Sequence, residues 1–193
     1  RFEDSIELAS AMVSIGERTG RKTVAFITSM DDPLGLAVGN SLEVIEAIET
    51  LKGRGPRDLQ MLSLELAAKM VEMGTNYTHE ESRELVKDAV YSMKALEKLG
   101  EMIKRQGGNP EVIDNYNLFD QASIKYELIA ETDGYIVSMD TNAIGTASML
   151  LGAGRAIKSD PIDYSAGIIF NKKTRSKIEK GTLVATLYTN NEY

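Results

Sequence analysis

The spacing of apolar residues near the amino terminus predicts an amphipathic helix over residues 4–19. The next segment, residues 22–30, is a nearly continuous run of apolar and β-branched residues, KTVAFITSM. Such a run is typical of a strand that is buried on both faces in a parallel sheet. A helix followed by a buried strand indicates an α/β arrangement for this part of the chain.

Helical spacing continues after the predicted strand. Residues 40–51 begin with NSLE, which can cap a helix, and residues 57–74 carry two apolar stripes, as a largely buried helix does. The capping-box pattern THEE at residues 78–81 predicts a further helix over about residues 79–98, ended by Gly100. The first half of the chain is therefore expected to be mainly helical.

The pattern changes near residues 118–122. Apolar and polar residues alternate beyond that point, which is typical of short strands, and only residues 142–151 show helical spacing. We therefore expect an α/β (α+β) fold with two domains. Residues 1–120 form part of a mixed or parallel sheet domain with helices, and residues 121–193 form a β-rich, barrel-sandwich-like domain that is incomplete at its end.

Composition narrows the class of protein. The chain has 193 residues, 22 basic and 29 acidic, and its formal charge of −7 argues against a nucleic-acid partner. It has no cysteine, which excludes a thiol nucleophile and a Cys-ligated metal. No apolar stretch approaches the roughly 20 residues that span a bilayer, so no membrane partner is expected. The chain starts with Arg1 rather than Met and ends in a strand-like run, so we expect both ends to be cut.

Four short motifs have plain structural interpretations. The basic stretch around Lys172-Lys173 is expected to be a solvated turn. Residues 176–189 read as a strand, a turn at Lys180-Gly181 and a second strand; this layout is similar to biotinyl and lipoyl carrier half-barrels, where a lysine at such a turn is modified. The single histidine, His79, is expected on the surface at a helix start, without a catalytic role. GAGR at residues 152–155 lacks the P-loop and dinucleotide patterns, so a tight turn is expected there.

The segment from Leu34 to Glu46 is the strongest candidate for a binding site. It begins just after a predicted strand, at the edge where open α/β sheets bind their ligands. Glu43 and Glu46 are three residues apart on the predicted helix, which places both carboxylates near one face. Carboxylate and carbonyl oxygens suit a hard cation such as K⁺ or Ca²⁺. The residues alone leave a capped surface helix as the alternative.

The same segment resembles a known enzyme family. AVGNSLEVIEAIETLKG at residues 37–53 matches the pattern AxGNxxEVxEAIxxLxG, which recurs in pyrimidine-nucleoside and thymidine phosphorylases. The likeness continues through ETDGYIV at residues 131–137, LLGAGRAIKSDPIDYSAGI at residues 150–168 and GTLVATLYTN at residues 181–190. The chain is therefore identified as a carboxyl-terminal fragment of this family, and residues 1–120 as part of its α/β catalytic domain.

The resemblance implies an activity for the full-length protein. Family members catalyse the reversible phosphorolysis of uridine, thymidine or deoxyuridine to the free base and a pentose 1-phosphate. Their phosphate and base motifs, including a Lys-His-Ser-Thr-Gly-Gly-like loop, do not occur here, so we assign no catalytic or substrate-binding residue and expect the fragment to be inactive. The Pro33-Leu34-Gly35 version of the loop is closer to the broad-specificity pyrimidine enzymes than to the strict thymidine enzymes. A strict thymidine phosphorylase, a nucleotide phosphorylase and a structural module without activity of its own are the alternatives.

The resemblance also implies a metal site, partners, an oligomeric state and a cellular location. The positions that match the family's cation ligands are the carbonyls of Leu34 and Ala37 and the carboxylate of Glu46, with potassium or calcium as the ion and the remaining ligands outside this chain. No organic cofactor is implied. Phosphate and the pyrimidine nucleoside are the partners, and the full-length protein is expected to be a cytoplasmic homodimer.

Overall fold

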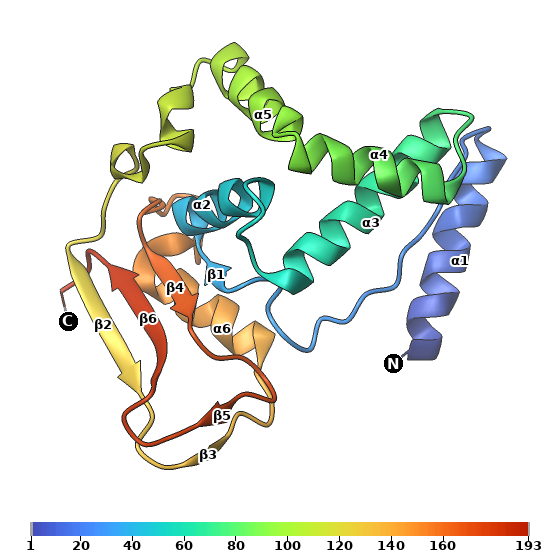
Figure 1. Cartoon of the computed structure of the whole chain (residues 1–193). Helices are drawn as coiled ribbons and strands as arrows, with labels where there is room; N and C mark the ends of the chain where they lie inside the picture. Colours follow the sequence, from blue (N-terminus) through green and yellow to red (C-terminus); the bar gives the residue numbers. More distant parts are fainter. Residues whose placement is uncertain (1, 193) are drawn as a thin grey trace.

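The computed structural model describes residues 2–192, which form a helical part and a small antiparallel sheet (Figure 1). The helices are α1 (Phe2–Arg18), α2 (Asn40–Leu51), α3 (Arg57–Gly74), α4 (His79–Tyr91), α5 (Lys94–Arg105) and α6 (Thr141–Ser148). Shorter turns of helix are η1 (Pro110–Ile113), η2 (Tyr116–Leu118) and η3 (Met149–Ala153). No helix in this part of the chain combines the length and apolar character needed to cross a membrane.

The helix predictions hold for α1, α2 and α3 but fail between residues 79 and 105. The predicted capping box is present, since the Glu81 amide donates to Thr78 Oγ1 over 3.3 Å and the Thr78 amide donates to Glu81 Oε2 over 2.8 Å. The single helix predicted over residues 79–98 is wrong, because Met93 adopts a left-handed conformation (φ 65°) that separates α4 from α5. Gly100 lies inside α5 rather than ending a helix.

Residues 22–30, predicted to be a strand buried in a parallel sheet, are extended but pair with no strand of the described chain. Their apolar side chains are exposed, with Met30 at 75% and Val24 at 44%. A strand requires a neighbour that completes its backbone hydrogen bonds. The prediction of a buried parallel strand is therefore wrong for the structure described.

The sheet is formed by the second half of the chain together with one short strand from the first. Its order is β1 (Ala37–Val38), β4 (Gly167–Phe170), β6 (Leu183–Thr189) and β2 (Ile124–Ile129), and every neighbouring pair is antiparallel. A separate ribbon joins β3 (Gly134–Tyr135) to β5 (Lys177–Ile178). Mixed helices and strands confirm the α+β class, although the parallel pairing expected for the sheet is wrong and the four-stranded sheet is open.

The predicted strand, turn and strand at residues 176–189 are present with different pairing. The turn closes where the Thr182 amide donates to the Glu179 carbonyl over 2.9 Å. However, β5 pairs with β3, whereas β6 lies between β4 and β2, so the two strands do not form a hairpin with each other. Local spacing located these strands correctly, but their partners are distant in sequence.

Two apolar clusters stabilise the fold on either side of α2. One is formed by Ile48 of α2 with Leu96 and Ile113. The other is formed by Ile168 and Phe170 of β4 with Ala185 of β6, covered by side chains of α6 and η3. Since β1 pairs with β4, the segment before α2 belongs to the same sheet as the carboxyl-terminal strands. The division into domains at residues 1–120 and 121–193 stays a prediction.

Candidate functional site

The loop that precedes β1 turns sharply toward α2. Gly35 has a φ of 73°, a left-handed conformation that side chains with a Cβ rarely adopt. A Cβ at this position would lie 2.1 Å from Glu46 Oε2, so the absence of a side chain lets the Glu46 carboxylate approach the loop backbone. The tight turn is thus matched to one particular side chain of α2.

The Glu46 carboxylate is the centre of this region. Its Oε1 atom accepts hydrogen bonds from the backbone amides of Leu36, over 2.8 Å, and Ala37, over 3.1 Å. Glu43, one turn earlier, accepts from the Gly39 amide over 3.0 Å. The two carboxylates predicted to share a face of α2 both bind the backbone that leads into the helix.

The Ala37 carbonyl is directed to the free edge of the sheet. In β1 and β4 the Phe170 amide donates to the Leu36 carbonyl over 2.8 Å, and Ala37 is opposite Ile169. In an antiparallel ladder, residues alternate along a strand. One residue directs its amide and carbonyl to the paired strand, and the next directs both away from it. The Ala37 amide bonds Glu46 there, so the Ala37 carbonyl is on the same side as the Glu46 carboxylate.

The electrostatics of this site favour a positive charge. Burial of the Glu46 carboxyl raises its pKa, the hydrogen bonds from Leu36 and Ala37 oppose that rise, and the charges of Asp58 and Glu43 add to it. The net result is a pKa above the ordinary value. A cation beside these oxygens would relieve both the desolvation and the repulsion between carboxylates.

The three residues implied as ligands lie in and beside the loop that Glu46 binds, while their role as cation ligands stays a prediction. Glu46 binds the Ala37 amide, and Leu34 lies next to Gly35 with 47% of its surface exposed. Oε1 of Glu46 already accepts two amides, which leaves Oε2 and the two carbonyls as the oxygens for a cation. Residues 2–192 contain no group of three or more acidic, histidine or cysteine side chains arranged for a metal. The donor set fits a hard cation held largely by carbonyls.

Two residues that sequence reasoning missed complete the surroundings of the loop. Asp58 Oδ2 accepts the Gly35 amide over 3.2 Å and the Lys173 ammonium over 2.6 Å. The Lys173 ammonium also donates to the Pro33 carbonyl. The sequence predicts Lys173 in a solvated turn, but its side chain is only 19% exposed, so that prediction is wrong for this lysine. No local signal marks the pair, since Asp58 and Lys173 are 115 positions apart.

The remaining candidate residues have structural roles. His79 begins α4, where its ring contacts Glu72 at 2.9 Å and Glu65 at 2.7 Å, both on α3. Gly152 has a φ of 114° in a tight turn, and its carbonyl accepts the Asp163 amide over 2.9 Å. These contacts join neighbouring elements, and neither arrangement resembles a catalytic or phosphate site.

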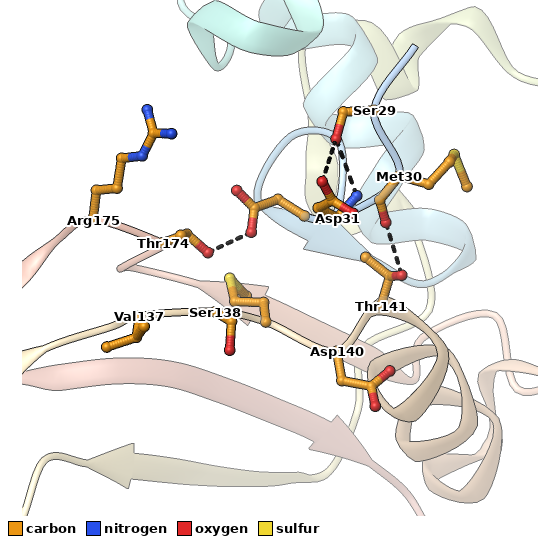
Figure 2. Close-up of a pocket in the computed structure, with 11 residues that line it drawn as sticks. Ser29, Met30, Asp31, Val137, Ser138, Asp140, Thr141, Thr174 and Arg175 are labelled. Carbon is orange, nitrogen blue, oxygen red and sulfur yellow. Dashed lines mark hydrogen bonds between the residues drawn. The ribbon is translucent and has the colours of Figure 1, made fainter. Parts of the chain in front are cut away.

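A polar pocket of about 760 Å³ lies next to the loop (Figure 2). Its walls come from residues 29–32, 137–141 and 174–175. Most of its polar groups already have partners: Ser29 donates to Asp31 over 3.1 Å, and Thr141 donates to the Met30 carbonyl over 2.9 Å. We therefore assign the pocket no ligand.

Comparison with known proteins places these features in context. A family profile described as the pyrimidine nucleoside phosphorylase C-terminal domain matches residues 135–193. The chain is 47% identical over 192 residues to proteins named pyrimidine-nucleoside phosphorylase from Staphylococcus aureus strains USA300 and NCTC 8325 / PS 47. Each alignment covers 99% of this chain and 44% of the relative. The chain therefore spans less than half the length of these relatives.

Proposed function

Because the chain is homologous along 99% of its length to pyrimidine-nucleoside phosphorylases, we propose that it is the carboxyl-terminal part of an enzyme with that activity. The reaction is the reversible phosphorolysis of a pyrimidine nucleoside, in which phosphate displaces the base from the anomeric carbon to give a pentose 1-phosphate. The observation that carries this proposal is the 47% identity, which includes the loop and helix around Glu46.

Within that enzyme the chain contributes scaffold and a cation site rather than the reacting groups. Catalysis of this kind depends on positioning phosphate and nucleoside and on stabilising charge on the departing base. The groups that the resemblance implies for those tasks do not occur in this sequence. We expect the Leu34 and Ala37 carbonyls and Glu46 Oε2 to hold K⁺ or Ca²⁺, which neutralises charge and fixes the loop.

The activity is tested on the natural full-length protein with uridine, thymidine and deoxyuridine, by following phosphate-dependent release of the base. We expect turnover of all three nucleosides, since Pro33-Leu34-Gly35 resembles the broad-specificity enzymes. Turnover of thymidine and deoxyuridine without uridine would identify a strict thymidine phosphorylase instead. No turnover of any pyrimidine nucleoside or nucleotide would contradict the proposal. The 193-residue chain assayed alone is expected to be inactive.

The cation site is tested through Glu46. Glu46→Gln keeps the shape of the side chain but removes the charge, so binding of K⁺ or Ca²⁺ to the full-length protein should weaken strongly. Glu43→Gln is the matched control for loss of a charge, because Glu43 accepts the amide of Gly39, the residue before α2, without belonging to the proposed ligand set. Equal affinities for the natural protein and Glu46→Gln would show that the assignment is wrong. We further propose a cytoplasmic homodimer, which sedimentation and fractionation of the natural protein would test.

A further inference from the structure

The pairing between β1 and β4 continues beyond these short strands. Ala37 is opposite Ile169 in the ladder. One step further along each chain, the Phe170 amide donates to the Leu36 carbonyl over 2.8 Å. The two segments therefore keep one antiparallel register as they leave the sheet, with the loop on one side and the turn after β4 on the other.

Three and four residues after Phe170, side chains continue the same register. The Lys173 ammonium donates to the Pro33 carbonyl, and the Thr174 hydroxyl bonds the Asp32 carboxylate. Figure 2 shows the Thr174 hydroxyl directed at the loop, with its bond drawn. Each step back along the loop is still matched by one step forward from β4. Side chains thus replace backbone groups where the ladder has ended.

Asp58 links this ladder of contacts to α3. One of its oxygens, Oδ2, accepts both the Lys173 ammonium over 2.6 Å and the Gly35 amide over 3.2 Å. Lys173 and Asp58 together therefore hold the Pro33 carbonyl and the Gly35 amide. These two groups belong to the residues on either side of Leu34, so their positions fix the direction of the Leu34 carbonyl.

We propose that Lys173 and Asp58 are positioning residues that orient the Leu34–Ala37 loop for cation binding. The proposal rests on the cation site proposed above. Lys173 lies in the segment that matches the family profile, whereas Leu34 lies outside it, so the carboxyl-terminal domain would set the geometry of ligands carried by the first half of the chain. Neither residue is part of the proposed ligand set, since the Lys173 ammonium can only donate hydrogen bonds and the Asp58 carboxylate already accepts three, two at Oδ2 and one from the Leu59 amide at Oδ1.

The sign of the effect distinguishes positioning from simple electrostatics. Lys173 carries a positive charge beside a proposed cation site, so removing that charge would tighten cation binding if repulsion were its only influence. Loss of the Pro33 and Asp58 contacts would instead free the loop and weaken binding. Lys172 is a matched control because it is the adjacent lysine and also partly buried, and its only hydrogen bond within residues 2–192 is from its backbone amide to the Val184 carbonyl.

The experiment compares Lys173→Met, Lys172→Met and Lys173→Arg in the natural full-length protein. Affinities for Ca²⁺ come from calorimetry, and those for K⁺ from stabilisation against heat at constant ionic strength with choline chloride as the replacement salt. Lys173→Met should weaken binding about tenfold, a change of about 1.4 kcal/mol. Lys172→Met should bind as tightly as the natural protein or slightly tighter, and Lys173→Arg should restore most of the affinity, since a guanidinium can bond both the carbonyl and the carboxylate.

A second readout follows the loop itself. Hydrogen exchange of a peptide covering residues 33–37 should accelerate in Lys173→Met and not in Lys172→Met. Two results for Lys173→Met would overturn the positioning role: unchanged hydrogen exchange of this peptide, or cation affinity equal to or tighter than that of the natural protein. If Glu46→Gln loses cation binding in the same experiments, the cation site is still supported. Natural affinity in Glu46→Gln shows instead that the cation site is wrong, and the positioning role falls with it.

Discussion

Replacing Gly35 with alanine tests the close fit between the loop and α2. The new Cβ would lie 2.1 Å from Glu46 Oε2, so the carboxylate must move. A left-handed alanine costs about 1 kcal/mol. Moving the carboxylate also weakens its two hydrogen bonds from backbone amides, which are charge-assisted and half-buried, at a further cost of about 2 kcal/mol. We expect Gly35→Ala to lower the free energy of unfolding by about 3 kcal/mol.

Gly53→Ala is the matched control for this prediction. Gly53 has a φ of 77°, nearly the same as the 73° of Gly35, but a Cβ at Gly53 would meet no atom within 4 Å. It should therefore show only the conformational cost, about 1 kcal/mol. Urea unfolding of the natural full-length protein followed by circular dichroism measures both. If Gly35→Ala costs no more than Gly53→Ala, the close approach of the Glu46 carboxylate to Gly35 does not stabilise the fold.

Two further predictions concern structural contacts away from the loop. Glu49 bonds Arg54 and Tyr116, and these bonds hold its pKa at about 2. Its pKa is lowered by folding, so its contribution of about 1–2 kcal/mol is present above the unfolded pKa near 4.5 and is lost as pH falls toward 2. Arg54→Ala should reduce the loss of stability with falling pH, measured as the midpoint of urea unfolding between pH 5 and 2. The same pH dependence in the variant and the natural protein would show that Arg54 does not lower the pKa of Glu49. The Ser82 hydroxyl is fully buried and has no hydrogen-bond partner in residues 2–192, so Ser82→Ala should raise the free energy of unfolding by about 1 kcal/mol. A loss of stability in that variant would show that the hydroxyl has a partner or a packing role.

Local patterns were most reliable where a feature depends on neighbours in sequence. The capping box of α4 was predicted from Thr78 and Glu81 alone and is present, because both of its hydrogen bonds lie within four residues. The break at Met93 was missed because its surroundings have good helical spacing and no proline or glycine. A left-handed residue of that kind depends on how α4 and α5 pack, which spacing does not record.

The candidate site likewise contains residues that a sequence motif identifies and residues that only the fold brings together. The residues implied as ligands, Leu34, Ala37 and Glu46, lie within thirteen positions of one another and form part of one recognisable motif. The structure shows Glu46 bound to the Ala37 amide, while the cation itself stays a prediction. Asp58 and Lys173 belong to no such motif, and only the folded chain brings them to the Gly35 amide and the Pro33 carbonyl.

The sequence by itself determined most of the helical segments, though not the break between α4 and α5, the presence of short strands in the second half, and which family the chain resembles. These properties follow from side-chain periodicity and from motifs, and both can be read along the chain. Tertiary structure decided the strand partners, since β1 pairs with β4 across about 130 residues while residues 22–30 have no partner in the described chain. Backbone hydrogen bonds between strands require two segments to meet, and apolar spacing in either one does not identify the other.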